Sequence, residues 1–254
     1  MSRHPLKWLL SGLALLAAPV ALADSSTSIP VFQSRVAAAR APSSPGGVQV
    51  LRAELVEAIN ALFYDDLALD AAERAFLGDR IHDLPFNVDV TASAQKYLID
   101  FHELNDLATT SAPLGLEFVA PTPQEQYGVS GPLAAVSEVA EGYIPNGLGV
   151  ANQITLRQKA AEVFLTDNLD YLFIPITPRE LIQRLSTPMS HGTALPDEVD
   201  GAASLITQIS RNSNRLYVLG WSCERCGGSR GLIVAAVSTD RRFVRMVKFR
   251  TYVD

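Results

Sequence analysis

Two cysteines offer the clearest chemistry in this sequence of 254 residues. Cys223 and Cys226 are separated by Glu224 and Arg225 in the stretch WSCERCGG. Such a pair can be a thiol-disulfide redox centre, half of a zinc site, or a disulfide that closes a turn. Each of these needs different neighbouring residues, so the flanking sequence helps to distinguish them.

A redox pair of the thioredoxin type needs a helix directly after the cysteines, because the helix N-terminus lowers the pKa of the first thiol. Here two glycines follow the pair and then the β-type run GLIVAAV (231–237), which favours a strand. A structural zinc site takes four Cys or His ligands. The available histidines, His82, His102 and His191, show no ligand spacing. The redox and metal interpretations are therefore disfavoured.

The remaining interpretation is a disulfide at the tip of a β-hairpin. The ends of a four-residue turn approach within about 7 Å, and a disulfide tolerates Cα separations of roughly 4.4–6.8 Å. A loop that is rigid before contact loses less conformational freedom on association, so it would make a useful binding surface. The bridge can equally serve only to fix the turn, and the sequence leaves both interpretations open. The candidate binding residues are Glu224, Arg225, Arg230 and Trp221.

The segment from Leu216 to Arg230, continuing through GLIVAAV, resembles the disulfide-bearing hairpin of the periplasmic inhibitors of vertebrate lysozyme. In that family a cysteine-closed loop plugs the lysozyme cleft, so the resemblance implies a protein partner and an inhibitory role. The likeness covers this segment alone. The family's loop is longer and carries a histidine and an aspartate between its cysteines, whereas this one has only Glu224 and Arg225. The inhibitory contact is therefore not carried over.

Other candidate chemistry is weaker. The acidic stretch DDLALDAAE (65–73) lacks the alternating oxygen ligands and the glycine of an EF-hand calcium loop. His102 falls in a helical pattern, and the adjacent Ser190 and His191 do not by themselves make a nucleophile and base. No phosphate-binding, dinucleotide-binding or nucleophile-elbow motif is present. We expect no cofactor, and an enzyme is the less favoured class.

The first residues have the pattern of an export signal. Arg3 and Lys7 precede an apolar run that begins at Trp8, and an Ala-Leu-Ala end at Ala21–Ala23 supplies a cleavage site. The run contains Gly12 and Pro19 and is shorter than the roughly 20 apolar residues of a spanning helix. We therefore expect a signal peptide over 1–23, a periplasmic or secreted protein, and no transmembrane segment after cleavage.

Charge is divided unevenly along the chain. Residues 24–210 carry 10 Lys and Arg against 24 Asp and Glu, a net −14, and residues 211–254 carry 9 against 3, a net +6. A basic segment can dock on an acidic partner. Because its arginines are interleaved with core-type residues, we expect it to pack against the acidic remainder of the protein. A nucleic-acid partner is not expected.

The N-terminal half predicts helices. Residues 24–47 are rich in Ser, Pro, Ala and Gly and predict a flexible leader. Residues 48–110 predict a helical region, in which Leu51, Leu55, Ile59 and Leu62 recur at helical spacing. Asp70 and Glu73 form a capping-box pattern for a second helix over 71–79, and AQKYLIDFHEL (94–104) predicts a third.

Residues 111–254 predict an α+β region that ends in an antiparallel β-meander. Helices are expected to begin at Thr155 and after the capping box of Thr177 and Glu180. Strands are expected at 116–119, 171–176, 204–210, 215–221, 231–237 and 242–252, with a polar loop at 190–201. The fold class is therefore α+β, with an N-terminal helical segment followed by an antiparallel β-meander with flanking helices.

These patterns together predict an exported bacterial envelope protein that acts by binding a protein partner. Inhibition of an envelope hydrolase through the disulfide-closed hairpin is the most specific form of this hypothesis. The alternatives are an exported hydrolase with an unrecognised His/carboxylate site and a thiol-disulfide oxidoreductase.

Overall fold

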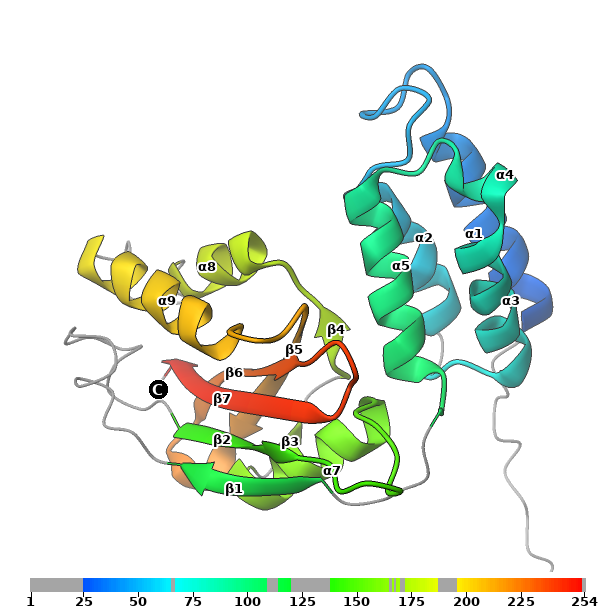
Figure 1. Cartoon of the computed structure of the whole chain (residues 1–254). Helices are drawn as coiled ribbons and strands as arrows, with labels where there is room; N and C mark the ends of the chain where they lie inside the picture. Colours follow the sequence, from blue (N-terminus) through cyan, green and yellow to red (C-terminus); the bar gives the residue numbers. More distant parts are fainter. Residues whose placement is uncertain are drawn as a thin grey trace, which may run out of the picture.

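The fold is α+β, as the sequence predicts (Figure 1). A computed structural model describes residues 25–64, 67–108, 114–119, 138–164, 166, 168–169, 172–186 and 196–252. Helices from the N-terminal part form one bundle, and the rest of the described chain forms an antiparallel sheet with helices packed on it. In this described part, no helix combines the length and apolar character needed to cross a bilayer.

The helices are α1 (Ser25–Ala39), α2 (Arg52–Phe63), α3 (Ala71–His82), α4 (Leu84–Asn87), α5 (Ala92–Asn105), α7 (Gln153–Phe164), α8 (Pro178–Ser186) and α9 (Pro196–Ile209). The strands are β1 (Gly115–Val119), β2 (Glu138–Tyr143), β3 (Asn168–Leu169), β4 (Ile174–Pro175), β5 (Arg215–Cys223), β6 (Ser229–Val237) and β7 (Phe243–Tyr252). A short 3₁₀ turn, Glu224–Cys226, links β5 to β6.

Helix α1 corrects the expectation of a flexible leader. Its residues Phe32, Val36 and Ala39 are buried, at spacings of four and three, and belong to the core of the helical bundle. The ring of Phe32 meets the edge of Phe76 at a centroid distance of 5.2 Å. Few large apolar residues suffice here because they fall on one face and pack against the apolar residues of the other bundle helices.

Helices α2, α3 and α5 follow their sequence signals, whereas the short α4 was not predicted. Asp70 accepts a hydrogen bond from the Glu73 amide (2.8 Å), and Glu73 accepts one from the Asp70 amide (2.9 Å), so the capping box is formed. Helices α2 and α5 lie where their periodicity predicts. The buried apolar residues of this bundle core are Phe32, Val36, Ala39, Val50, Leu55, Ala58, Ile59, Leu62, Phe63, Leu69, Leu77, Phe86, Val90, Ala94, Tyr97, Leu98 and Phe101.

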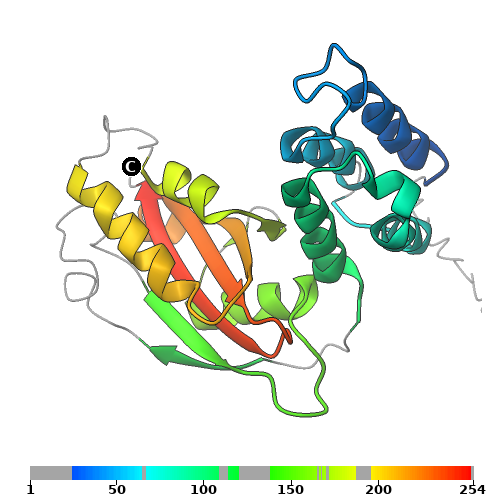
Figure 2. The same cartoon turned by 45° about the horizontal axis from the view of Figure 1, so that its top comes forward.

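The sheet has the order β1-β2-β7-β6-β5-β3, with β4 also pairing with β5, and all of these pairs are antiparallel. The β5-β6-β7 meander matches the sequence prediction. Helices α8 and α9 contribute Leu181, Leu185 and Ile206 to the core on one face. Helix α7 contributes Leu156 and Phe164 to the core on the other. Figure 2 shows α9 lying along β7.

Several expected elements differ from the structure. Residues 204–209 belong to α9 rather than to a strand, because Leu205, Ile206 and Ile209 follow helical spacing and all three are buried. Since α9 begins at Pro196, the expected loop at 190–201 is also wrong in its second part, and 190–195 lie outside the described residues. In the described part of the expected strand 171–176, the strand β4 is confined to Ile174–Pro175, and β2 was not predicted.

Arginines of the basic C-terminal segment hold the sheet to α5. Arg215 of β5, which is 8% exposed, donates two hydrogen bonds to the Glu103 carboxylate. These hydrogen bonds raise the pKa of the Arg215 guanidinium. Arg241, in the turn between β6 and β7, donates to Asp106 (2.8 Å) and to the carbonyl of Ala151. With the Arg245–Glu141 and Lys248–Glu138 ion pairs, these contacts confirm that basic residues of this segment pair within the protein.

Phe32→Ala tests the position of α1. We expect a loss of about 3–5 kcal/mol in the free energy of unfolding, because the change leaves a cavity in the bundle core. The exposed neighbour change Gln33→Ala is the matched control and should have little effect. Urea unfolding followed by circular dichroism measures both. Equal stability of the two variants would mean that 24–47 is a flexible leader after all.

Glu103→Gln tests the joint between α5 and the sheet. The change keeps the side-chain shape but leaves the buried Arg215 guanidinium without its anion, so we expect a loss of about 1.5–3 kcal/mol. Glu162→Gln removes a carboxylate from an exposed ion pair on α7 and is the control, for which little change is expected. If chemical denaturation gives the same midpoint for both variants, the ion pair does not hold the joint.

Candidate functional site

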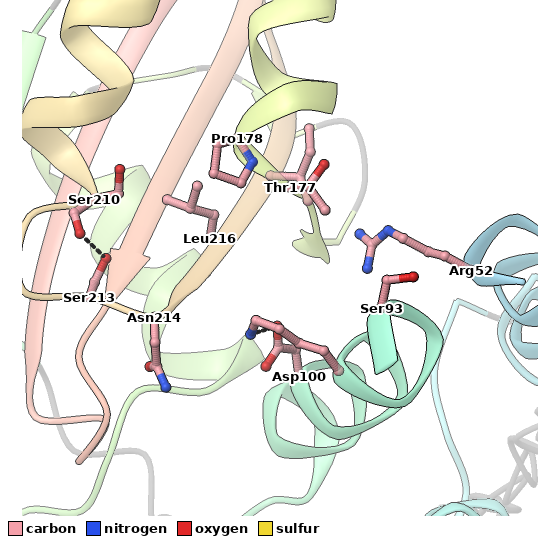
Figure 3. A pocket seen from close by; sticks show the side chains of 11 residues that line it. Arg52, Ser93, Asp100, Thr177, Pro178, Ser210, Ser213, Asn214 and Leu216 are labelled. Carbon is pink, nitrogen blue, oxygen red and sulfur yellow. Dashed lines mark hydrogen bonds and ion pairs between the residues drawn. The ribbon is translucent and has the colours of Figure 1, made fainter. Parts of the chain in front are cut away.

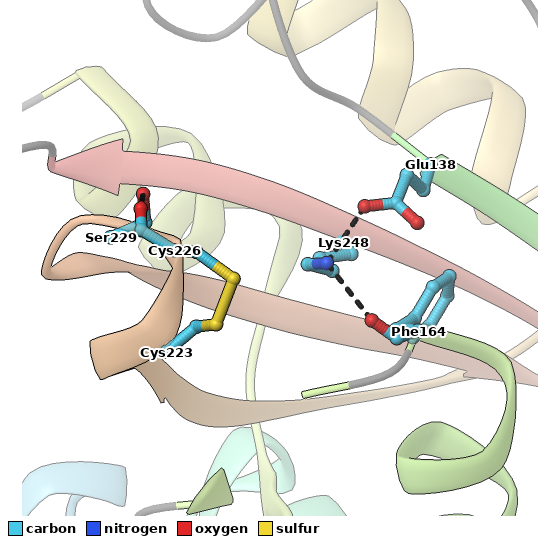
Figure 4. The surroundings of a disulfide bond; sticks show 6 residues. All are labelled: Glu138, Phe164, Cys223, Cys226, Ser229 and Lys248. Atoms are coloured by element: carbon cyan, nitrogen blue, oxygen red, sulfur yellow. Dashed lines mark hydrogen bonds and ion pairs between the residues drawn. A yellow bond between two sulfur atoms is a disulfide. The ribbon is translucent and has the colours of Figure 1, made fainter. Parts of the chain in front are cut away.

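The candidate site is the disulfide-closed tip of the β5-β6 hairpin. Cys223 ends β5 and is buried, whereas Cys226 is exposed. Their sulfurs are bonded, and their Cα atoms lie 5.2 Å apart (Figure 4). Strand β6 follows the bridge after two glycines, so the chain does not continue into a helix directly after Cys226. The expected strand after Cys226 is confirmed, and the geometry that a thioredoxin-type redox centre needs is not formed here.

The local sequence determines the shape of this loop. Gly227 and Gly228 have φ angles of 68° and 69°, in the left-handed region that other residues rarely occupy. The hydroxyl of Ser229 donates to the carbonyl of Cys226 (2.8 Å). Two consecutive left-handed residues, one side-chain hydrogen bond and the covalent bridge therefore fix the turn.

The base of the hairpin is anchored in the sheet. Trp221 Nε1 donates to the carbonyl of Phe249 (2.8 Å), and Lys248 Nζ lies 4.7 Å from the Trp221 ring centroid. Lys248 also donates to Glu138 (2.7 Å) and to the carbonyl of Phe164 (3.1 Å), as Figure 4 shows. Because Trp221 is only 3% exposed, it cannot contact a partner directly. The expectation that it belongs to the binding surface is wrong, and its role is to hold the loop in place.

At the base of the hairpin, the backbone of Gly231 lies close to Phe249 of β7 and to the Trp221 side chain. A Cβ at this position would lie 1.8 Å from the carbonyl oxygen of Phe249 and 2.8 Å from Trp221 Nε1. The register between β6 and β7 shifts between Arg230 and Gly231. A glycine is therefore needed where the hairpin bends beside its tryptophan anchor.

The tip itself presents charge. Glu224, Arg225 and Arg230 are all exposed, so three of the four predicted binding residues lie on the surface of this hairpin. They combine one carboxylate with two guanidinium groups. The tip can therefore offer planar, bidentate hydrogen bonds to carboxylates of another molecule.

The histidines considered from the sequence do not come together. His82 is exposed at the end of α3, whereas His102 is half-buried on α5 and faces Gly78, where an added Cβ would lie 3.1 Å from its Nε2. His191 lies outside the described residues. The carboxylate next to His102 in the sequence, Glu103, is hydrogen-bonded to Arg215. The described histidines and carboxylates thus form no evident catalytic arrangement.

A metal site is not formed among the described residues either, since they contain no group of three or more His, Cys, Asp or Glu side chains able to hold an ion. Asp70 and Glu73 of the acidic stretch 65–73 serve as a helix cap, and Glu73 also accepts a hydrogen bond from Ser28. Asp65 and Asp66 lie outside the described residues.

A cleft between α5 and the edge of the sheet near β4 and β5 was not predicted from the sequence. Its lining comes from positions between Arg52 and Leu216, and no histidine is among them. Because these positions are spread over separate segments, no local motif could have indicated the cleft. It becomes visible only once the two parts of the fold are packed together.

Comparisons with protein-family models, with curated proteins and with solved structures found no match for this chain. The resemblance of the hairpin to the lysozyme inhibitors therefore stays a hypothesis.

The cysteine bridge can be tested by the double change Cys223→Ser, Cys226→Ser. We expect a loss in unfolding free energy at or below about 2–4 kcal/mol, because a ring this small removes little chain entropy. The circular dichroism spectrum of the sheet should persist. Wild-type protein kept in reductant is the control and should lose the same amount. Two titratable thiols in unreduced protein would contradict the bridge.

Proposed function

We propose that this protein is exported to the bacterial envelope and binds a protein partner there through the tip of its β5-β6 hairpin, inhibiting an envelope hydrolase. The observation that carries the proposal is the exposed, disulfide-closed tip on an anchored base. Glu224, Arg225 and Arg230 provide the contact surface. Trp221 supports it from within the sheet.

Export is supported by the pattern of the first residues. Arg3 and Lys7, the apolar run after them and the Ala-Leu-Ala end at Ala21–Ala23 have the pattern of an export signal. A cut after Ala23 would leave α1 whole, since that helix begins at Ser25. A disulfide on the surface of a protein persists in oxidising compartments such as the periplasm. The bridge and the signal are therefore mutually consistent.

Rigidity is what suits the tip to recognition. The covalent bridge, the two left-handed glycines and the Ser229 hydrogen bond restrict the loop before any contact is made. A segment that is already ordered loses less conformational entropy on binding, so more of the contact energy appears as affinity. The sheet that carries the loop has helices packed against both faces, which gives it firm support.

Charge suggests which kind of hydrolase the tip would fit. Most enzymes that cleave glycosidic bonds use a pair of Asp or Glu residues in a cleft. Arg225 and Arg230 could enter such a cleft and hydrogen-bond these carboxylates, and Glu224 could pair with a cationic residue at its rim. The proposed partner is therefore a hydrolase with an acidic cleft, and an enzyme that cleaves the cell-wall glycan is the first choice.

Glu224→Ala combined with Arg225→Ala tests the tip. We expect the wild-type protein to capture a hydrolase from an envelope extract and to slow its action on cell-wall glycan. The double variant should lose most of both effects, about tenfold or more in apparent affinity, because truncating a charged group that is hydrogen-bonded within an interface costs about 2–5 kcal/mol and each 1.4 kcal/mol is about tenfold.

A matched double variant, Asp79→Ala with Arg179→Ala, removes one acidic and one basic exposed residue elsewhere. It should behave like wild type. Equal capture and equal inhibition by the tip variant and this control would exclude the tip as the contact surface.

A further inference from the structure

The cleft between the helical bundle and the sheet is a second site, separate from the hairpin tip. Its volume is about 260 Å³. One wall comes from α2 and α5, and the other comes from the segment before α8 and the start of β5 (Figure 3). Small-molecule sites commonly form at such junctions, and a cavity of this size suits a ligand smaller than a typical drug.

The guanidinium of Arg52, a residue of α2, lies in one wall of the cleft and is held in place by its neighbours. The Arg52 side chain is 15% exposed, and its guanidinium carbon lies 4.7 Å from the Tyr97 ring centroid. Nε and Nη2 donate to the Glu180 carboxylate, both at 3.1 Å, and Nη2 also approaches the carbonyl of Pro175. Nη1 has no acceptor among the described residues, and the group points toward the cleft in Figure 3. The arginine is thus held in one orientation with hydrogen-bonding capacity left.

Three other charged or amide groups around the cleft are an ammonium, the carboxylate paired with it, and a side-chain amide. Lys96 Nζ is 2.6 Å from Asp100 Oδ2, on α5. Burial raises the pKa of Asp100, and the hydrogen bond from Lys96 opposes this shift. Asn214, at the opposite wall, is exposed, and its side-chain oxygen already accepts from Arg215, which leaves its amide nitrogen as a donor. Donors on both walls favour a ligand that carries an acceptor group with negative charge.

The apolar part of the lining comes from Ile176, Pro178 and Leu216, and the hydroxyl side chains Ser93, Thr177, Ser210 and Ser213 complete it. Ile176 and Leu216 are 7% and 5% exposed, and Pro178 stands beside them at the start of α8. Figure 3 shows Pro178 and Leu216 across the cleft from Asp100. A ligand would therefore contact donors with one end and hydrocarbon with the other. A free inorganic anion would use only the first of these features.

From this arrangement we propose that the cleft binds a small aliphatic monocarboxylate, with its carboxylate near Arg52 and Lys96 and its hydrocarbon chain against Ile176, Pro178 and Leu216. This site goes beyond the proposed function and does not depend on it, because it shares no residue with the hairpin tip. Its test uses no protein partner.

The test is a titration of isotopically labelled protein with sodium hexanoate, followed by two-dimensional NMR. Hexanol and hexylammonium have the same chain without the anion, and inorganic phosphate has the anion without the chain. We expect saturable shifts for the amides of Ser93, Ser213 and Leu216 with hexanoate, and binding weaker by about tenfold or more for the other three compounds.

Arg52→Gln should weaken hexanoate binding by at least about tenfold, whereas Arg179→Gln, an exposed arginine of α8, should leave it unchanged. If circular dichroism shows that Arg52→Gln is unfolded, Lys96→Gln replaces it and should weaken binding several-fold. Equal binding of hexanol, unchanged affinity in the folded variant, or no saturable shifts would overturn the proposal. So would shifts centred on the exposed apolar residues Leu84 and Val88, because they would indicate nonspecific hydrophobic binding.

Discussion

The structure depends on helix α5, because its buried residues belong to two hydrophobic cores. Over most of its length, α5 buries Ala94, Tyr97, Leu98 and Phe101 in the helical bundle. Its last turn then places Leu104 in the core beneath the sheet. A helix in this position cannot rotate without exposing apolar surface on one side or the other, at a cost of roughly 25 cal/mol per Å². The bundle and the sheet are therefore held in one relative orientation, and the cleft exists because of it.

Ion pairs at the end of α5 strengthen this joint. Hydrogen bonds from Arg215 to Glu103 and from Arg241 to Asp106 connect the helix to β5 and to the β6-β7 turn. These pairs explain the uneven distribution of charge along the chain, because acidic residues of the earlier part pair with basic residues of the C-terminal segment. Pairs of this kind are costly to break when partly buried, because the remaining charge has no water to replace its partner. The basic segment is thus used, at these positions, to close the fold.

The sequence predicted the elements whose signals are local. The capping boxes at Asp70 and Thr177, the periodicity of α2 and the meander after Arg215 lie where they were expected. The sequence did not predict elements whose burial depends on residues that are distant along the chain. The composition of 24–47 predicts disorder, and only the other helices provide the surface that buries Phe32.

Trp221 shows a different kind of error. Its position next to the cysteines was interpreted as part of a binding loop, although it alternates with Leu219 and Cys223 and shares their buried face. The two-residue period of a strand already contained this information. The cleft, by contrast, had no signal at all, since Arg52 and Leu216 are brought together only by tertiary packing.

Strand β5 carries both proposed sites, and its pairing determines how far they can influence each other. Leu216 lines the cleft at one end and Cys223 begins the closed loop at the other, so at 3.3 Å per residue the two lie roughly 23 Å apart. Along this length β5 is paired with β6 on one side and with β3 and β4 on the other. A shift of β5 would have to break hydrogen bonds on both sides. A molecule in the cleft should therefore leave the shape of the loop unchanged, and the two sites act independently.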